Sequence, residues 1–392
     1  MSHPLIDRSS DLRRLRDEGY ELEIKSNYLL IHGIPYLGSD GSMWRGILVS
    51  ELTLVGDITT TPSTHVVHFV GGYPCQRDGS PMPQIRHTSS NQQLAEGLIV
   101  NHSFSNKPPG GYLDYYHKMT MYIGNISGPA QSVDPSATAK TFTVVESEAE
   151  ESVFNYIDTC SSRAGINLVS DKLKTRRIGI IGLGGTGSYV LDFVAKTPVS
   201  EIHLFDADLF LQHNAFRSPG AAAAEQLQPQ PAKVEYFGHL YSKMHKNIIQ
   251  HCKYIDASNA DELRAVDFVF ICVDRGSAKK PIIEKLEELG VPFVDAGMGI
   301  YETDNALGGI VRTTTSTPGQ REMSKRRICL SDDDGDDDYS QNIQIAELNA
   351  LNAALAVIKW KKLCGFYRDC GNEHHSLYTI DVDILTNEDY AA

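Results

Sequence analysis

The 392-residue sequence predicts an α/β protein in which a smaller α+β domain precedes a doubly wound, mostly parallel sheet. Three observations lead to this prediction. The length suits two or three domains. From Arg176 onward, short and nearly continuous apolar runs alternate with helical segments, as expected for parallel strands covered on both faces. A glycine-rich turn follows the first of these runs. We expect the domains at residues 1–145 and 146–392.

The first domain mixes helical and strand-like segments. A short amphipathic helix carries Leu12 and Leu15 on one side, and breaks rich in proline and glycine separate the runs that follow it. Residues 128–141 are expected to form a linker or an irregular loop, and residues 146–172 are expected to be helical. The expected strands are residues 27–34, 45–56, 64–72 and 117–126.

The second domain alternates strands and helices in the order typical of a doubly wound sheet. A sixth strand candidate, residues 306–315, is more polar and is expected at a sheet edge. A long loop is expected at about residues 312–341. A helix should follow over residues 342–363, with Leu348, Leu351 and neighbouring apolar residues as its buried face. The five apolar strand candidates are residues 177–183, 201–208, 252–257, 267–274 and 292–298.

The glycine-rich turn has the pattern G-x-G-G-x-G and opens a helix. Its glycines are Gly182, Gly184, Gly185 and Gly187. Glycine allows the sharp turn and the close approach of backbone to a phosphate, which the N–H groups of the helix N-terminus can bind. The next strand ends in Asp206, whose carboxylate can accept hydrogen bonds from a ribose diol. These features predict a Rossmann-like nucleotide site, but they do not choose between a dinucleotide and ATP.

Four polar residues downstream favour ATP. They are Asn214, Arg217, Lys233 and the strand-end Asp274. A hydride-transferring enzyme does not need two cations near the phosphates, nor a carboxylate at that strand end. An adenylating enzyme can use Arg217 and Lys233 to neutralise charge as pyrophosphate leaves, and Asp274 to hold Mg²⁺. Taken singly, each could also be an ordinary surface residue or, for Asp274, a helix cap.

The set GxGGxG, DxD, NxxR, PxKVE and a strand-end Asp resembles the ThiF/MoeB/HesA family over about residues 150–365. That family includes the adenylation domains of ubiquitin-activating enzymes. The resemblance implies ATP-dependent adenylation of the C-terminal glycine of a ubiquitin-like or sulfur-carrier protein. It assigns the ribose to Asp206, phosphate contacts to Asn214, Arg217 and Lys233, and magnesium to Asp274. The family's Arg-Gln pair is Arg217-Ser218 here.

The same resemblance raises the question of a cysteine nucleophile and a partner arginine. Cys329 lies in the expected loop, after three cations that favour a thiolate and before the aspartates of residues 332–338 that oppose it. It could equally be a small residue on a mobile loop. Family members often use an arginine from a partner subunit, and Arg163 is the candidate, which implies a homodimer. No CxxC pair exists, so no zinc is expected.

Residues 66–87 resemble the third-strand region of ubiquitin-conjugating folds through a strand followed by Tyr-Pro and further prolines. The histidine-proline-asparagine segment and the downstream cysteine of active conjugating enzymes are not visible. Cys75 directly follows the Tyr-Pro, upstream of the position expected for a nucleophile. We therefore expect this domain to recruit a partner, such as a conjugating enzyme, without cysteine chemistry of its own.

Charge and composition exclude several classes of protein. The 36 basic and 50 acidic residues give a net charge of −14, which argues against a nucleic-acid or anionic-membrane surface. Seven sparse cysteines, no signal-like segment and no long apolar stretch predict a cytoplasmic protein. A bacterial ubiquitin-like conjugation pathway would suit a chain that joins a recruiting domain to an adenylation domain. The alternatives are an NAD-dependent oxidoreductase and a non-catalytic nucleotide-binding adaptor.

Overall fold

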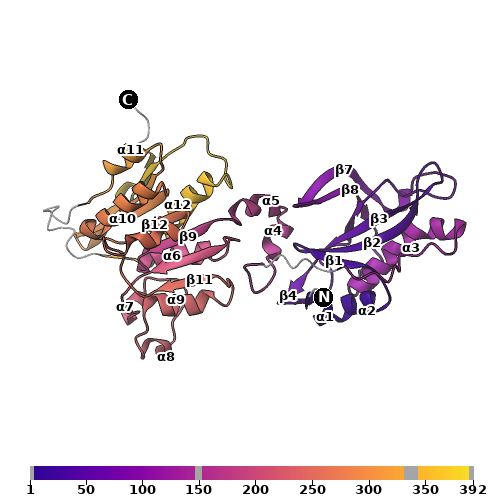
Figure 1. Cartoon of the computed structure of the whole chain (residues 1–392), viewed down its shortest axis with the longest axis horizontal. Helices are drawn as coiled ribbons and strands as arrows, with labels where there is room; N and C mark the ends of the chain where they lie inside the picture. Colours follow the sequence, from indigo (N-terminus) through magenta and orange to yellow (C-terminus); the bar gives the residue numbers. More distant parts are fainter. Residues whose placement is uncertain (1–3, 146–151, 331–342, 388–392) are drawn as a thin grey trace. The chain divides into compact units, whose positions relative to one another are not determined.

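The computed structural model describes residues 4–145, 152–330 and 343–387. The chain divides into two compact units, Met1–Leu168 and Val169–Ala392 (Figure 1). A mixed α/β second unit follows an antiparallel first unit, which confirms the predicted fold class. Within the described residues, no helix is both long and apolar enough to cross a membrane.

The first unit is built on a six-stranded antiparallel sheet with the order β1-β2-β3-β6-β8-β7. The helices α1 to α3 contribute to a hydrophobic core on one face of this sheet. Its elements are α1 (Pro4–Arg8), α2 (Ser10–Asp17), β1 (Leu22–Lys25), β2 (Tyr28–Leu37), β3 (Met43–Glu51), β4 (Leu54–Val55), β5 (Ile58–Thr59), β6 (Val66–Val70), η1 (Pro83–Ile85), β7 (Arg86–Ala95), β8 (Leu98–Ser105), α3 (Tyr115–Val133), α4 (Thr159–Arg163) and α5 (Asn167–Ser170).

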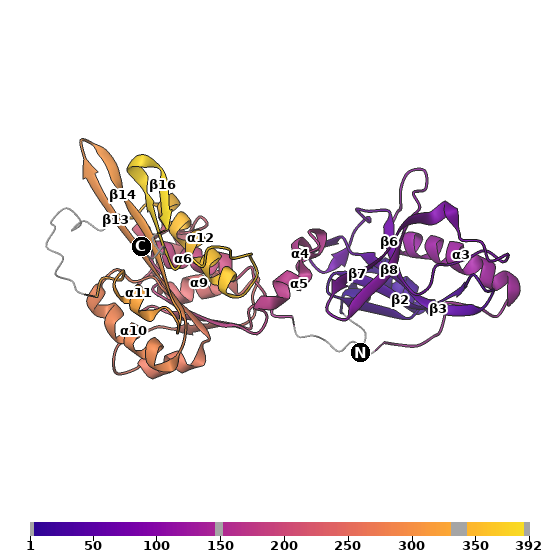
Figure 2. The ribbon, with the colours of Figure 1, turned by 90° about the horizontal axis from the view of Figure 1, so that it is seen from above.

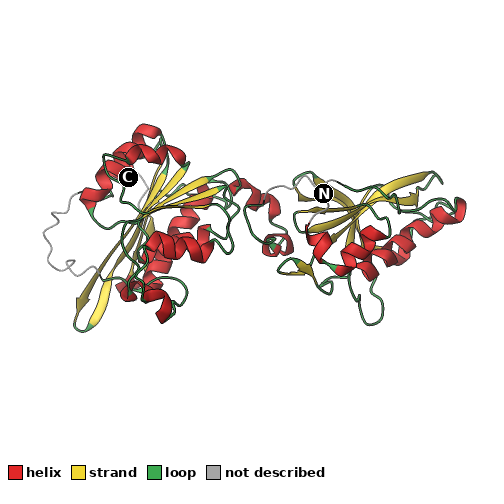
Figure 3. Ribbon diagram, turned by 60° about the horizontal axis from the view of Figure 1, so that its bottom comes forward, coloured by secondary structure: helices red, strands yellow, loops and turns green. Residues whose placement is uncertain are grey.

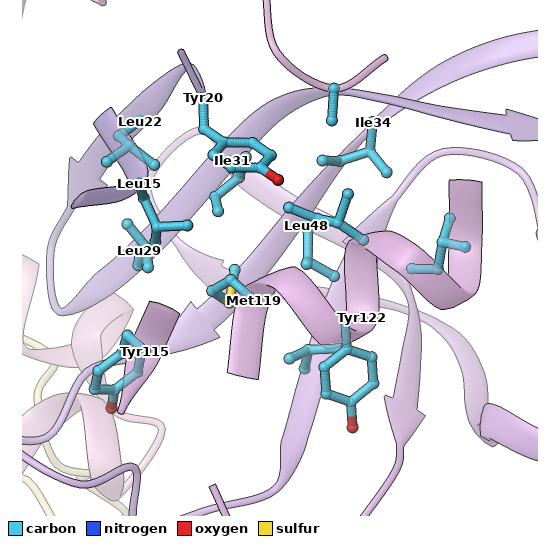
Figure 4. Packing of buried hydrophobic residues seen from close by; sticks show 14 of the residues in the cluster. Leu15, Tyr20, Leu22, Leu29, Ile31, Ile34, Leu48, Tyr115, Met119 and Tyr122 are labelled. Carbon is cyan, nitrogen blue, oxygen red and sulfur yellow. The ribbon is translucent and has the colours of Figure 1, made fainter. Parts of the chain in front are cut away.

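The expected strand at residues 117–126 is wrong, because this segment forms the middle of helix α3. Asp114 caps the helix by accepting a hydrogen bond from the backbone of the third helical residue. Tyr115, Met119 and Tyr122 follow at helical spacing and are fully buried. Figure 4 shows these three side chains beside the leucines and isoleucines of the sheet. The helical period therefore prevails over the strand propensity of individual residues.

The segment that joins the two units also differs from the prediction. The continuous helix expected over residues 146–172 is replaced by the short helices α4 and α5, and residues 146–151 lie outside the described residues. The side chain of Asn27 donates a hydrogen bond of 2.8 Å to Ser162 Oγ, which fastens α4 to the sheet of the first unit. The boundary therefore falls at residue 168, later than the expected residue 145.

The second unit contains an eight-stranded sheet with the order β11-β10-β9-β12-β13-β14-β15-β16. Helices cover both of its faces (Figure 3). Its elements are η2 (Asp171–Leu173), β9 (Arg177–Ile181), α6 (Gly185–Val194), β10 (Glu201–Phe205), α7 (Gln212–Ala215), α8 (Ala224–Leu227), α9 (Lys233–Tyr241), β11 (Ile248–His251), η3 (Ala260–Ala265), β12 (Phe268–Ile271), α10 (Gly276–Leu289), β13 (Phe293–Thr303), β14 (Ala306–Ser316), α11 (Arg321–Lys325), α12 (Ala346–Leu363), β15 (His375–Thr379), η5 (Ile380–Val382) and β16 (Ile384–Asn387).

Strands β11, β10, β9, β12 and β13 are parallel, and the chain reverses its direction of progress across the sheet at β9. In an open parallel sheet, ligands bind at the carboxyl ends of the strands beside such a reversal. The expected strand at residues 252–257 is wrong, because the third parallel strand is β11, which ends before that segment begins.

The antiparallel part of the sheet corrects two further expectations. Strand β14 was expected at an edge, but β13 and β15 pair with it on its two sides. Its threonines are buried and tolerate this interior position because threonine suits a pleated strand. The loop expected at residues 312–341 begins later, since β14 continues to Ser316 and α11 follows. Residues 331–341 lie outside the described residues. Figure 2 shows the β13–β14 hairpin and β16 from above.

Helix α12 confirms the expected long helix but buries a different face. Asn349, Ala353, Ala356 and Trp360 are almost completely buried, whereas Leu348 and Leu351 are only half-buried. The small side chains allow α12 to pack closely against α6, the helix that the glycine turn opens.

Candidate nucleotide-binding and activation site

The glycine turn needs glycine at two positions for steric reasons. Gly182 has a φ of +88°, and a Cβ there would lie 2.6 Å from the carbonyl oxygen of Cys272. A Cβ on Gly187 would lie only 1.8 Å from the carbonyl oxygen of Gly182. Strands β9 and β12 and helix α6 therefore meet at a turn that no larger residue could form.

The other two glycines have different surroundings. Gly184 is the N-cap residue of α6, and a Cβ on it would meet nothing within 4 Å, so the space beside this residue is open. The exposed N–H groups and dipole of a helix N-terminus favour a phosphate there. Gly185 is instead in close contact with Asn349 of α12, whose Nδ2 atom would lie 2.0 Å from an added Cβ. The turn thus fits a nucleotide phosphate on its open side.

Asp206 follows β10 and is attached to the glycine turn. Its Oδ2 atom accepts a hydrogen bond of 2.6 Å from the backbone N–H of Leu183, and its Oδ1 atom accepts one of 2.7 Å from the N–H of Asp208. The carboxylate is buried. Its position beside the turn suits the predicted contact with ribose.

Lys233 begins helix α9, and its side chain is 8% exposed. Its Nζ atom lies 2.6 Å from a carboxylate oxygen of Asp208 and 3.5 Å from one of Asp206. Burial alone would raise the pKa of Asp208, but hydrogen bonds from Lys233 and Tyr254 lower it. Hydrogen bonding to Asp208 in turn raises the pKa of Tyr254 to about 12. Lys233 is therefore held close to the glycine turn as a cation between two anions.

Asn214 and Arg217 lie in the segment after Asp206 and differ in the hydrogen bonds of their side chains. Asn214 is buried, and its Oδ1 atom accepts a hydrogen bond of 2.9 Å from the N–H of Leu211, so it organises its own turn. Arg217 has a buried Nε atom without a hydrogen-bond partner among the described residues. An unpaired buried donor is costly unless a ligand engages it. The unpaired guanidinium donor keeps Arg217 a candidate for an anion contact.

Asn349 connects the glycine turn to Arg217, and the sequence did not reveal it. Its Oδ1 atom accepts a hydrogen bond of 3.0 Å from Thr186 Oγ1, and its Nδ2 atom donates one of 3.4 Å to the carbonyl oxygen of Arg217. A polar residue on the predicted apolar helix gave no functional signal by itself. Only the packing of α12 on α6 shows that Asn349 holds the two parts of the site together.

Asp274 follows β12 at the same edge of the sheet and is exposed. Its carboxylate accepts a hydrogen bond of 3.1 Å from the side chain of Gln344, which precedes α12. Within the described residues, no group of three or more His, Cys, Asp or Glu side chains could hold a metal ion. A single carboxylate still fits Mg²⁺, which often binds through one or two carboxylates, substrate phosphates and water.

The cysteines fall into clearly different environments. Cys329 is exposed, whereas the neighbouring Ile328 is buried and Leu330 packs on the same hydrophobic cluster. Burial raises the pKa of the Cys272 thiol well above its usual range. Cys75 is buried, and burial raises the pKa of its thiol too. Cys75 is therefore a poor nucleophile, and Cys329 is exposed on a segment with two apolar anchors.

Arg163 lies on α4 in the first unit and is exposed. Burial raises the pKa of the Glu51 carboxyl in the same unit, and the charge of Arg163 partly opposes this rise. A role as a partner arginine requires a second copy of the chain, so that role stays a prediction.

Two family models match the chain. Residues 10–159 match a domain of unknown function, DUF6791, so the expected relation to ubiquitin-conjugating folds stays a prediction. Residues 162–387, more than half of the chain, match the ThiF family.

Relatives and solved structures give partial matches. Ubiquitin-like modifier-activating enzyme 5 from Gallus gallus is 28% identical over 161 residues, which cover 38% of this chain and 40% of that protein. The enzyme of the same name from Dictyostelium discoideum is 26% identical over 153 residues, which cover 36% of this chain and 39% of that protein. The chain thus matches about two fifths of the length of these relatives. Two solved structures are similar. E. coli MccB has a TM-score of 0.46 and 18% identity, covering 58% of this chain and 68% of its own. PaaA has a TM-score of 0.45 and 14% identity, covering 56% of this chain and 75% of its own. Because the ThiF model matches residues 162–387, which include the glycine turn and the candidate site residues after it, the chain belongs to the ThiF family.

Proposed function

We propose that the protein uses ATP to adenylate the C-terminal glycine of a ubiquitin-like or sulfur-carrier protein. One observation carries the proposal: the cationic side chain of Lys233 is held beside the glycine turn through Asp206. The backbone of Arg217, the second candidate cation, is linked to the same turn through Asn349. A dehydrogenase site would not need this arrangement, so membership of the ThiF family and the two cations favour adenylation over NAD chemistry.

In the proposed reaction, a carboxylate oxygen of the carrier attacks the α-phosphorus of ATP. The bond between this phosphorus and the bridging oxygen breaks, and pyrophosphate leaves with the negative charge. Lys233 stabilises that charge because its carboxylate partners position it before the reaction begins, and Arg217 supplies a second cation. Asp206 would orient the ribose, and Asp274 would hold a magnesium ion that supplies further charge neutralisation.

A second step would transfer the acyl group to Cys329. The Cys329 thiolate attacks the acyl carbon of the adenylate, the carbon–oxygen bond to AMP breaks, and AMP leaves. The exposure of Cys329 supports this choice over Cys75 and Cys272, whose thiols have raised pKa values.

The remaining parts of the proposal concern partners and setting. The first unit would recruit a partner, for which a conjugating enzyme is the candidate. A homodimer would allow Arg163 of one copy to act at the site of the other. A cytoplasmic bacterial conjugation pathway would supply the carrier protein. A nucleotide-binding adaptor without turnover remains the alternative, and measurement of turnover distinguishes the two.

Exchange of radiolabelled pyrophosphate into ATP tests the proposal directly. The full chain is incubated with ubiquitin-like and sulfur-carrier proteins, each in an intact form and in a form lacking the C-terminal glycine. We expect exchange only with an intact carrier, and a loss of at least about a hundredfold in Lys233→Met, as for removal of a group that stabilises transition-state charge. Lys253→Met is the matched control, because Lys253 pairs with Glu262 instead of the site carboxylates. Background exchange with every intact carrier would refute the proposal.

A further inference from the structure

The segment that carries Cys329 is attached to the body of the second unit. Ser324 Oγ lies 2.9 Å from Ser316 Oγ at the end of β14, and Lys325 lies 3.0 Å from Glu287 of α10. Ile328 is buried in the hydrophobic cluster between α10 and the sheet. These contacts position the backbone on both sides of residue 326, close to the cysteine.

One further contact joins this segment to a charge cluster inside the unit. The guanidinium of Arg312, on β14, donates one hydrogen bond to the carbonyl oxygen of Arg327 and another of 2.7 Å to Asp295 Oδ2. The side chain of Asp295 is fully buried on β13, and its Oδ1 atom lies 2.8 Å from Nζ of Lys279 on α10. Arg312 thus uses its two Nη groups to connect the buried carboxylate to the backbone two residues before Cys329.

This geometry is specific to arginine. A planar guanidinium can bind two acceptors in fixed directions, whereas a lysine ammonium is a single point charge on a flexible stem. Two cations surround one buried carboxylate, so the charge of Asp295 is compensated even if one of them is redirected. The Nη1 group of Arg312 is therefore not needed to neutralise Asp295, and its hydrogen bond to the Arg327 carbonyl oxygen calls for another explanation.

We propose that Arg312 is a positioning residue for the acyl-transfer step, because it fixes the backbone that presents Cys329. This inference rests on the proposed function for the role of Cys329, but the restraint on the segment can be measured without that reaction. A displacement of about 1 Å in a reacting group can slow a reaction about a hundredfold, so a restraint on this backbone has a large effect.

The decisive variant is Arg312→Lys in the full chain. It preserves a cation beside Asp295 but removes the second directed donor. The matched control is Lys279→Gln, which alters the same buried cluster without contacting the Cys329 segment. Three quantities are compared: hydrogen exchange of the amides in residues 321–330, ATP–pyrophosphate exchange, and the rate of thioester formation with a carrier protein.

We expect Arg312→Lys to accelerate hydrogen exchange in residues 321–330 at least about fivefold and to slow thioester formation about tenfold or more, while pyrophosphate exchange stays within about twofold. Lys279→Gln should leave hydrogen exchange in this segment unchanged. Unchanged hydrogen exchange in Arg312→Lys, or an equal change in both variants, would overturn the proposal. If the wild-type chain forms no thioester, the proposed acyl transfer fails, and the hydrogen-exchange comparison still decides whether Arg312 restrains the segment.

Discussion

The contact between Gly185 and Asn349 leads to a quantitative prediction about the glycine turn. A Cβ on Gly185 would lie 2.0 Å from Nδ2 and 2.4 Å from Cγ of Asn349. Asn349 cannot move aside easily, because it is buried and its amide bridges Thr186 and the Arg217 carbonyl. Gly185→Ala should therefore destabilise the second unit by about 1–3 kcal/mol, the usual cost of overpacking.

The partner substitution should remove this cost. Asn349→Ala loses two hydrogen bonds and should destabilise by about 1–2 kcal/mol. In the double variant, the new methyl group at residue 185 occupies space that the amide has left. Its stability should therefore be close to that of Asn349→Ala alone, which gives a coupling energy of about 1–3 kcal/mol.

Urea unfolding, followed by the fluorescence of Trp360, measures the stability of the parent chain, the two single variants and the double variant. Trp360 is fully buried against Phe268 and Phe270 in the second unit, and Trp44→Phe removes the other tryptophan of the chain. Gly184→Ala is the matched control, because its Cβ would meet nothing within 4 Å and should not couple to Asn349. Additive effects of Gly185→Ala and Asn349→Ala, within about 0.5 kcal/mol, would refute the packing argument.

Three further predictions concern single groups. Asp208→Asn removes the closer of the two carboxylates that hold Lys233, so the KM for ATP in pyrophosphate exchange should fall severalfold; an unchanged or higher KM would contradict this. Burial lowers the pKa of Lys118 to about 7, so the unfolded chain binds more protons than the folded chain between about pH 7 and pH 10. The first unit should therefore become more stable as pH rises through that window. Amide hydrogen-exchange protection factors in α3 measure this stability, and Lys118→Met should abolish their rise with pH. Alkylation followed by mass spectrometry should modify Cys329 in the native protein but Cys75 only after unfolding, and rapid native labelling of Cys75 would disprove its burial.

The parts of the site that depend on local sequence were predictable. The glycine turn and Asp206 follow strands directly, Asp274 comes shortly after β12, and the carboxyl ends of parallel strands meet at one edge of the sheet. The sequence therefore predicted the edge of the sheet where these residues gather, whereas their roles stay predictions. Lys233 followed from its motif, although its ion pair with Asp208 did not.

The rest depended on contacts between distant segments. Asn349 lies far along the chain from Thr186, and a lone polar residue in a helix carries no signal about its tertiary partner. The sequence predicted a strand at helix α3 because its aromatic and branched residues favour strands. The Asp114 cap and the burial of one helix face against the sheet instead stabilise a helix. Strand β14 looked polar, but neighbouring strands on both sides satisfy its backbone.

The late position of α12 in the chain has a consequence for the order in which the protein is made. Ribosomes release the glycine turn and all five parallel strands before α12 emerges, and domains generally begin to fold during synthesis. Until α12 arrives, Gly185 and Thr186 lack their contact with Asn349, and Arg217 lacks its link to the turn. A nascent chain can therefore build most of the sheet before the contacts of Asn349 complete the candidate site, so the proposed reaction should begin only after nearly the whole second unit has been translated.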